Sequence, residues 1–95
     1  MKEYIIIKVD RHESRKTGAY TRWVFSGEAK MLYSTYDCRR THWFEYWYVE
    51  KGSIARRYRR TNLGNVHVHE YPVEMFKISP VEEKYLREIL KPGGE

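Results

Sequence analysis

Seven short segments rich in β-branched and aromatic residues follow one another along this chain, separated by polar, glycine or proline residues. Such residues favour strands, because their side chains suit a pleated and half-buried surface. The predicted strands are residues 3–9, 20–25, 29–34, 42–50, 53–60, 66–71 and 73–78. The last is expected at a sheet edge because Pro72 interrupts the pattern before it. In the sixth, the alternation predicts that Val66 and Val68 face the core.

One segment, residues 80–91, has the apolar spacing of a helix. Ser79 is the expected N-cap, Pro80 occupies the first helical position, and Glu82 follows the cap by three residues. This arrangement is a capping box with proline at a position where its missing N–H costs nothing. We expect the helix to pack on the sheet as a structural lid. Its predicted buried stripe consists of Val81, Tyr85, Leu86, Ile89 and Leu90.

The 95 residues predict a single domain spanning positions 1–95. The fold class is α+β and mainly β, with about six or seven strands and one C-terminal helix. We expect a curved antiparallel sheet or a partly closed barrel. Ile, Leu and Val number 17 in total, which is few for an aliphatic core, so the 15 aromatic residues must supply part of it.

Two hairpins are predicted from the short turns. Residues 26–28 are expected to join the second and third strands, and Lys51-Gly52 the fourth and fifth, with Glu50 opposite Ser53. In that register, both faces of the 42–60 hairpin alternate aromatic rings with guanidinium groups. Four arginines within residues 56–60 cannot all be buried, because an unpaired buried charge costs several kcal/mol. At least one face of the hairpin should therefore be exposed.

The basic groups are concentrated in the first two thirds of the chain. The net charge is +5, and residues 1–61 hold 14 basic and 7 acidic groups against 4 and 6 in residues 62–95. This distribution predicts a polyanionic partner. Guanidinium groups pair with phosphates, and exposed rings stack on unpaired bases at about 1–3 kcal/mol per base.

We therefore predict non-enzymatic binding of nucleic acid, DNA or RNA, through the basic and aromatic hairpin at 42–60. Stacking rings slightly favour single strands or RNA. The predicted contact residues are Arg39, Arg40, Trp43, Tyr46, Trp47, Arg56, Arg57, Tyr58, Arg59 and Arg60.

Two alternatives remain open. An interaction or inhibitor module could self-associate as a homodimer through the same aromatic hairpin, since Tyr, Trp and Arg dominate protein interfaces. A homodimer is also compatible with nucleic-acid binding. A small metal-independent ribonuclease would need a base, an acid and a cation, which His42, His67 or His69 and an arginine could supply. No established catalytic motif appears, so we expect a binding protein rather than an enzyme.

Other features narrow the class of protein. Cys38, His42, His67 and His69 are four potential zinc ligands, but their spacing is loose, and we expect neither a metal nor a cofactor. A single cysteine excludes an internal disulfide and favours a reducing, cytoplasmic location. The apolar run at residues 4–7 is far too short for a membrane span. The absence of Gln, with only two Asn and 33% charged residues, favours a thermophilic source.

Overall fold

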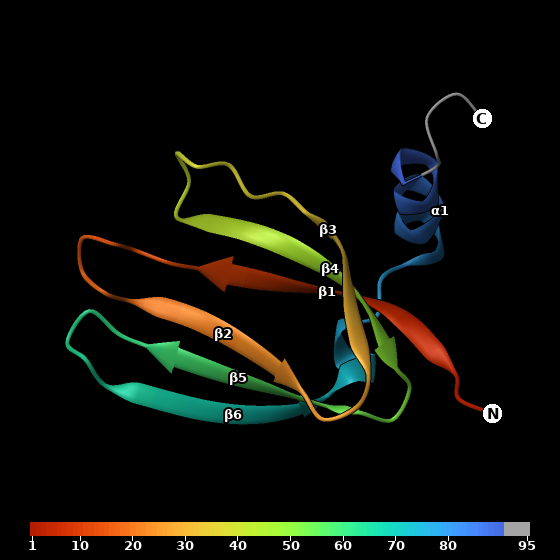
Figure 1. The fold of residues 1–95 in the computed structure, drawn as a ribbon, viewed down its shortest axis with the longest axis horizontal. Helices are drawn as coiled ribbons and strands as arrows, with labels where there is room; N and C mark the ends of the chain where they lie inside the picture. Colours follow the sequence, from red (N-terminus) through yellow and green to blue (C-terminus); the bar gives the residue numbers. More distant parts are fainter. Residues whose placement is uncertain (91–95) are drawn as a thin grey trace.

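Two antiparallel three-stranded sheets and one helix make up the computed structural model, which describes residues 1–90 (Figure 1). The strand orders are β1-β4-β3 and β2-β5-β6. The mainly β class and the antiparallel arrangement are confirmed, but the sheets do not close into a barrel. The elements are β1 (Tyr4–His12), β2 (Tyr20–Phe25), β3 (Ala29–Ser34), β4 (His42–Glu50), β5 (Ile54–Arg60), β6 (Val66–Pro72), the 3-10 helix η1 (Val73–Phe76) and α1 (Pro80–Ile89).

Both predicted hairpins are wrong, although their strands are correct. β2 pairs with β5 rather than with β3, and β4 lies between β1 and β3 rather than beside β5. The segment 42–60 is therefore not a hairpin, and its two strands belong to different sheets. Burial explains the choice, because Val49 on β4 and Ala55 on β5 are both fully buried in the one core that lies between the sheets.

The chain crosses between the sheets at residues 13–19, 26–28 and 51–53, and the last two crossings lie against each other. The Glu50 amide donates to the Glu28 carbonyl at 2.9 Å, and the Ile54 amide donates to Ser26 Oγ at 2.9 Å. A side chain on Gly27 would clash with Ser53 Oγ, so this close approach requires glycine. A turn sequence does not reveal whether the next strand rejoins the same sheet, and this is why both hairpins were mispredicted.

The core between the sheets is partly aromatic, as the small number of aliphatic residues requires. Ile7, Val49 and Val73 are fully buried there. The Trp23 ring meets the Phe76 ring edge-on at 5.1 Å, and Trp23 Nε1 donates to the Asp10 carbonyl at 2.8 Å. β1 and β2 belong to different sheets, and an isolated bridge joins them near Glu13 and Tyr20. The Trp23 bond links the two strands again beyond that bridge.

The last two predicted strands need correction. Val66 and Val68 are about half exposed, because Tyr71 turns inward against Trp23 and Phe76 and so sets the opposite parity for β6. Residues 73–78 do not form a strand. The first four residues form η1, and Lys77 then makes an isolated bridge to Ile7.

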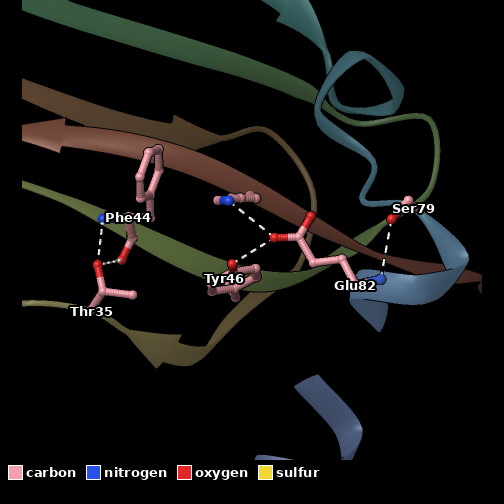
Figure 2. Close-up of polar contacts among 6 residues, drawn as sticks. Thr35, Phe44, Tyr46, Ser79 and Glu82 are labelled. Atoms are coloured by element: carbon pink, nitrogen blue, oxygen red, sulfur yellow. Dashed lines mark hydrogen bonds and ion pairs between the residues drawn. The ribbon is translucent and has the colours of Figure 1, made fainter. Parts of the chain in front are cut away.

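The helix begins as predicted. Ser79 Oγ accepts from the Glu82 amide at 3.1 Å, and α1 ends at Ile89, while Lys91 lies outside the described residues (Figure 2). The predicted stripe is mostly wrong, because Leu86 is its one buried member and packs with Ile6 and Ile78. The other four members, which lie beyond this contact, are exposed: Val81, Tyr85, Ile89 and Leu90.

The molecule has two unlike ends. The connections β1–β2, β3–β4 and β5–β6 lie together at one end, on the left of Figure 1, whereas α1 and the N-terminus lie at the other. The long axis between them measures 46 Å. Within residues 1–90, no helix is long and apolar enough to cross a membrane.

Candidate nucleic-acid interface

Three ordered connections form the end opposite α1. Residues 13–19 close through the Ser14 amide, which donates to the Ala19 carbonyl at 2.8 Å. Residues 61–65 close through the Thr61 amide, which donates to the Asn65 carbonyl at 2.9 Å. Each connection is thus held by its own backbone bonds and presents its side chains from a defined position.

The third connection, residues 35–41, is anchored at its start and turned at its centre. Thr35 Oγ1 accepts from the Phe44 amide at 2.8 Å (Figure 2). Asp37 then accepts from the Arg39 amide through Oδ1 at 2.9 Å and from the Arg40 amide through its carbonyl at 2.8 Å. This Asx turn displays two adjacent, exposed arginines.

Nine cationic side chains line the cavities at this end, and two carboxylates, Asp10 and Glu13, line them as well. We call this set the basic end. Its members are Arg11, Arg15, Lys16, Arg22, Arg39, Arg40, Arg57, Arg59 and Arg60.

Cations of the basic end are mostly without a carboxylate partner. Seven of the nine have no carboxylate within 4.0 Å among residues 1–90, the exceptions being Arg11 with Glu45 and Arg39 with Asp37. Of the eight other Lys and Arg residues in the described range, five are paired. The charge imbalance is therefore local, and it leaves the basic end with a positive field that favours anions.

Three adjoining cavities indent the basic end. Their volumes are about 590, 400 and 290 Å³. Ser14 lines all three, Thr41 is shared by the first and second, and Thr21 by the first and third. Because neighbouring cavities share walls, an extended ligand can occupy more than one of them.

The predicted arginines divide between two surfaces. Arg39, Arg40, Arg57, Arg59 and Arg60 belong to the basic end. Arg56 does not, because it leaves β5 on the opposite face from Arg57 and pairs with Glu70, with Nη2 at 2.6 Å from Oε2. Tyr58 shares that outer face and is half-buried opposite Arg22.

The predicted stacking rings of β4 are engaged in contacts within the protein. Trp43 is 8% exposed, and both Trp43 and Trp47 donate their Nε1 hydrogens to Glu45, each at 3.2 Å. Tyr46 lies on the other face of β4 and donates to Glu82 Oε2 at 2.7 Å (Figure 2). Trp43 lines the second cavity together with Arg39 and Arg40, but its ring is almost fully buried and makes a T-shaped contact with Tyr36 at 4.8 Å. Tyr46 and Trp47 line none of the three cavities, so the structure separates these two rings from the predicted arginines.

Sequence reasoning did not select Tyr36, which is 50% exposed in the 35–41 connection and lines the same cavity as Arg39 and Arg40. A tyrosine inside an otherwise polar connection is a detectable signal, because a buried role is improbable there. Arg22 and Thr61 were also missed as site residues. The place of Arg22 depends on the β2–β5 pairing, which is not a local property, whereas Thr61 begins the 61–65 turn, which is one.

The histidines form two separate pairs. His12 and His42 stack with ring centroids 4.2 Å apart, and burial, His42 and Arg59 together lower the pKa of His12. His67 and His69 lie on β6, opposite Arg59 and Arg57 in the ladder. Cys38 is exposed in the 35–41 connection. Across residues 1–90, no three His, Cys, Asp or Glu side chains are grouped in a way that could hold a metal ion.

Comparison of the chain with protein-family models, with characterised proteins and with solved structures finds no match. The function of this protein must therefore be inferred from the chemistry of the basic end. Unpaired guanidinium groups beside hydroxyls and an exposed ring can bind phosphates and stack on a base.

Proposed function

We propose that this protein binds nucleic acid through the basic end and does not act on it chemically. The observation that carries the proposal is the cluster of seven cations without carboxylate partners in residues 1–90, set around three adjoining cavities. Phosphates of a strand would neutralise these cations and release counterions, which is the dominant source of affinity in such complexes. The binding surface differs from the predicted 42–60 hairpin, although five of its arginines are the same.

Single strands fit this surface better than duplex. The cations surround indented cavities instead of forming a flat or protruding face, and a flexible strand follows such a contour more easily. Tyr36 offers a stacking ring beside Arg39 and Arg40. DNA and RNA share these features, and a comparison of the two is part of the test.

The test is fluorescence anisotropy with labelled single-stranded RNA, single-stranded DNA and duplex, each over a salt series. We expect the logarithm of affinity to fall linearly with the logarithm of salt concentration. The double variant Arg59→Ala/Arg60→Ala should weaken binding about tenfold or more, because it removes two charge-assisted phosphate contacts. It should also make the salt slope shallower by about 1.4 for a single strand.

The matched control is Lys77→Ala/Lys84→Ala, which removes the same charge from exposed positions outside the basic end. Equal weakening by both double variants would show a nonspecific charge effect and contradict the proposed site. Absence of binding even at low salt would overturn the function. Incubation of the RNA with the protein in EDTA should leave it intact, and cleavage would instead support the ribonuclease alternative.

Self-association is a second candidate, and one surface favours it. The outer face of the β2-β5-β6 sheet exposes Val24, Ile54, Val66 and Val68, each between 39 and 51% exposed. Arg56, Tyr58 and Arg60 lie opposite Val24, Val68 and Val66 on this face, so the apolar side chains alternate with polar ones. Exposed apolar side chains of this kind occur at protein interfaces. This face replaces the aromatic hairpin that was predicted for the same role. Light scattering tests it, and a dimer that Val68→Lys converts to a monomer would support it.

A further inference from the structure

The largest cavity of the basic end, of about 590 Å³, lies among the ends of β1 and β5 and the 61–65 turn. Arg57, Arg59 and Arg60 line it, and Asp10 is the one carboxylate among its lining residues. No carboxylate in residues 1–90 lies within 4.0 Å of these three arginines. Three like charges around one cavity repel one another, so the folded protein carries an electrostatic cost there that an anion would relieve.

Three buried side-chain polar atoms in the described part of the chain have no hydrogen-bond partner within the protein; one is Arg11 Nε, and the other two belong to residues that line this cavity. These two are Arg57 Nε and Thr61 Oγ1. Nine in ten or more of the buried polar groups in folded proteins have a partner, and an unsatisfied one costs about 1–3 kcal/mol. Two of the three such atoms therefore belong to residues of one cavity, an observation independent of the charge imbalance, and a hydrogen-bond acceptor bound there would lower both costs.

Both residues are held in place before any ligand binds. The Arg57 guanidinium carbon lies 5.5 Å from the centroid of the Tyr71 ring, which itself packs on Phe76. The Thr61 backbone is fixed because its amide donates to the Asn65 carbonyl at 2.9 Å and its carbonyl accepts from the Gly64 amide at 3.0 Å. Preorganised donors lose little conformational entropy on binding.

The rest of the lining indicates which part of a nucleotide fits. Hydroxyl and amide groups dominate it, with His12 as its one ring. A base needs flat apolar or aromatic contact, whereas a phosphate and a sugar need hydrogen-bond donors and acceptors. The polar members besides the arginines are Ser14, Thr17, Thr21, Thr41, Thr61 and Asn62.

We propose that this cavity is a sugar–phosphate site, in which Arg57 and Thr61 bind one phosphate group while the attached base stays outside. The inference rests on the proposed function and deepens it, since it assigns the cavity to the backbone of the bound strand. Arg59 and Arg60 add charge from the rim. Because the base is not contacted, nucleotides with different bases bind alike.

Thermal unfolding in the presence of small anions tests the site without any nucleic acid. The probes are inorganic sulfate, inorganic phosphate and the four ribonucleoside 5′-monophosphates, each against NaCl of equal ionic strength. We expect each to raise the melting temperature by roughly 5 °C at several times its dissociation constant. The four nucleotides should act equally, and nucleosides lacking phosphate should have no effect.

Adjacent residues on β5 provide the variant and its control. Arg57→Met should abolish the anion-dependent increase, whereas Arg56→Met, on the opposite face, should retain it. The comparison also removes the general stabilising effect of sulfate, which both variants share. Thr61→Val is a second, nearly isosteric variant, to be used if Arg57→Met does not fold. It should reduce the anion-dependent increase in melting temperature.

Equal anion responses of wild type and Arg57→Met, or of wild type and Thr61→Val, would overturn the sugar–phosphate site. So would a response to one nucleotide and not to the others.

Wild type that binds oligonucleotides without responding to anions would refute the site and leave the proposed function intact. An anion response without oligonucleotide binding would refute the function and leave the site intact. If a 5′-phosphorylated oligonucleotide binds tenfold tighter than the unphosphorylated one, the cavity holds a terminal phosphate. If the two bind with equal affinity, the cavity holds an internal phosphate.

Discussion

Glu45 determines where the tryptophans of β4 go. The residue is 6% exposed. Its carboxylate accepts hydrogen bonds from the Trp43 and Trp47 indoles and lies 3.7 Å from Arg11 Nη1. Buried indoles need an acceptor, and residues two apart on a strand share a face. The Trp-x-Glu-x-Trp spacing in residues 43–47 therefore predicts in principle that both rings follow the carboxylate inward. The prediction that these rings stack on bases did not take this into account.

We expect Glu45→Ala to destabilise the fold by about 3 kcal/mol, because it leaves two buried indole hydrogens and the Arg11 guanidinium without their partner. Urea unfolding measures the change. Glu28→Ala, at an exposed position, is the control and should change stability by about 1 kcal/mol or less. A similar result for both would mean that Glu45 does not hold the rings.

His12 should make stability depend on pH. Its pKa is lowered from the ordinary 6.5 by burial first, and then by His42 and Arg59. The unfolded chain therefore takes up a proton at higher pH than the folded chain, so stability falls as the pH decreases below about 7. The groups that face His12 or share its cavity are His42, Arg59, Arg57, Arg60 and Asp10.

Melting temperatures measured from about pH 5 to pH 8, in buffers free of phosphate and sulfate, test this dependence. His12→Asn should lose less stability than wild type on acidification. His67→Asn, at an exposed position on β6, should follow the wild-type curve. Superimposable curves for wild type and His12→Asn would contradict the assignment.

At the scale of elements, local signals were sufficient to identify strands and helix but not their partners. β2, β3 and β4 have the predicted bounds, because branched and aromatic content together with flanking turn residues are local properties. Pairing depends on which strands bury their apolar faces together, and that is decided by the whole core. The consequence for the site is direct: Arg56 and Arg57 were predicted together, but the parity of β5 puts them on opposite faces.

Besides the packing of Leu86, one carboxylate of the helix bonds to the β1-β4-β3 sheet. Glu82 Oε2 accepts from Tyr46 at 2.7 Å and from Lys8 Nζ at 3.0 Å, and these bonds, that of Tyr46 above all, lower the pKa of Glu82. In an ordinary capping box this side chain would turn back to the N-cap amide. Here it bonds to two neighbouring strands instead.

We expect Glu82→Gln to destabilise the protein by about 1 kcal/mol at neutral pH, because a charge-assisted acceptor is lost. Because the pKa of Glu82 is lowered, its contribution to stability is fully present above the ordinary pKa of 4.5. The contribution is lost as the pH falls through the pKa of Glu82 in the folded protein. The stabilities of wild type and variant should therefore converge in acid. Urea unfolding at neutral and acidic pH measures both effects. Glu83→Gln, which loses an exposed pair to Arg87, should cost less than half as much. A constant difference between wild type and Glu82→Gln at all pH values would contradict this linkage.

At the scale of the molecule, most stabilising contacts and most unpaired cations lie toward opposite ends of the long axis. The crossings at 26–28 and 51–53, the helix and most ion pairs lie away from the basic end, where repulsion is left uncompensated. A fold that is stabilised at one end can tolerate a strained arrangement of charges at the other. Such tolerance is expected where charge serves binding rather than stability.

This segregation predicts that salt stabilises the protein in the absence of any ligand. Raising NaCl from about 10 to about 100 mM shortens the screening length from about 30 to about 10 Å, which weakens repulsion among the arginines more than it weakens close ion pairs. The melting temperature should therefore rise. Arg59→Ala/Arg60→Ala should show a smaller rise, and Lys77→Ala/Lys84→Ala one close to that of wild type. Screening does not depend on the identity of the anion, so NaF and NaCl should act alike. A melting temperature that falls with added salt would mean that the ion pairs, and not the basic end, dominate the electrostatics of this fold.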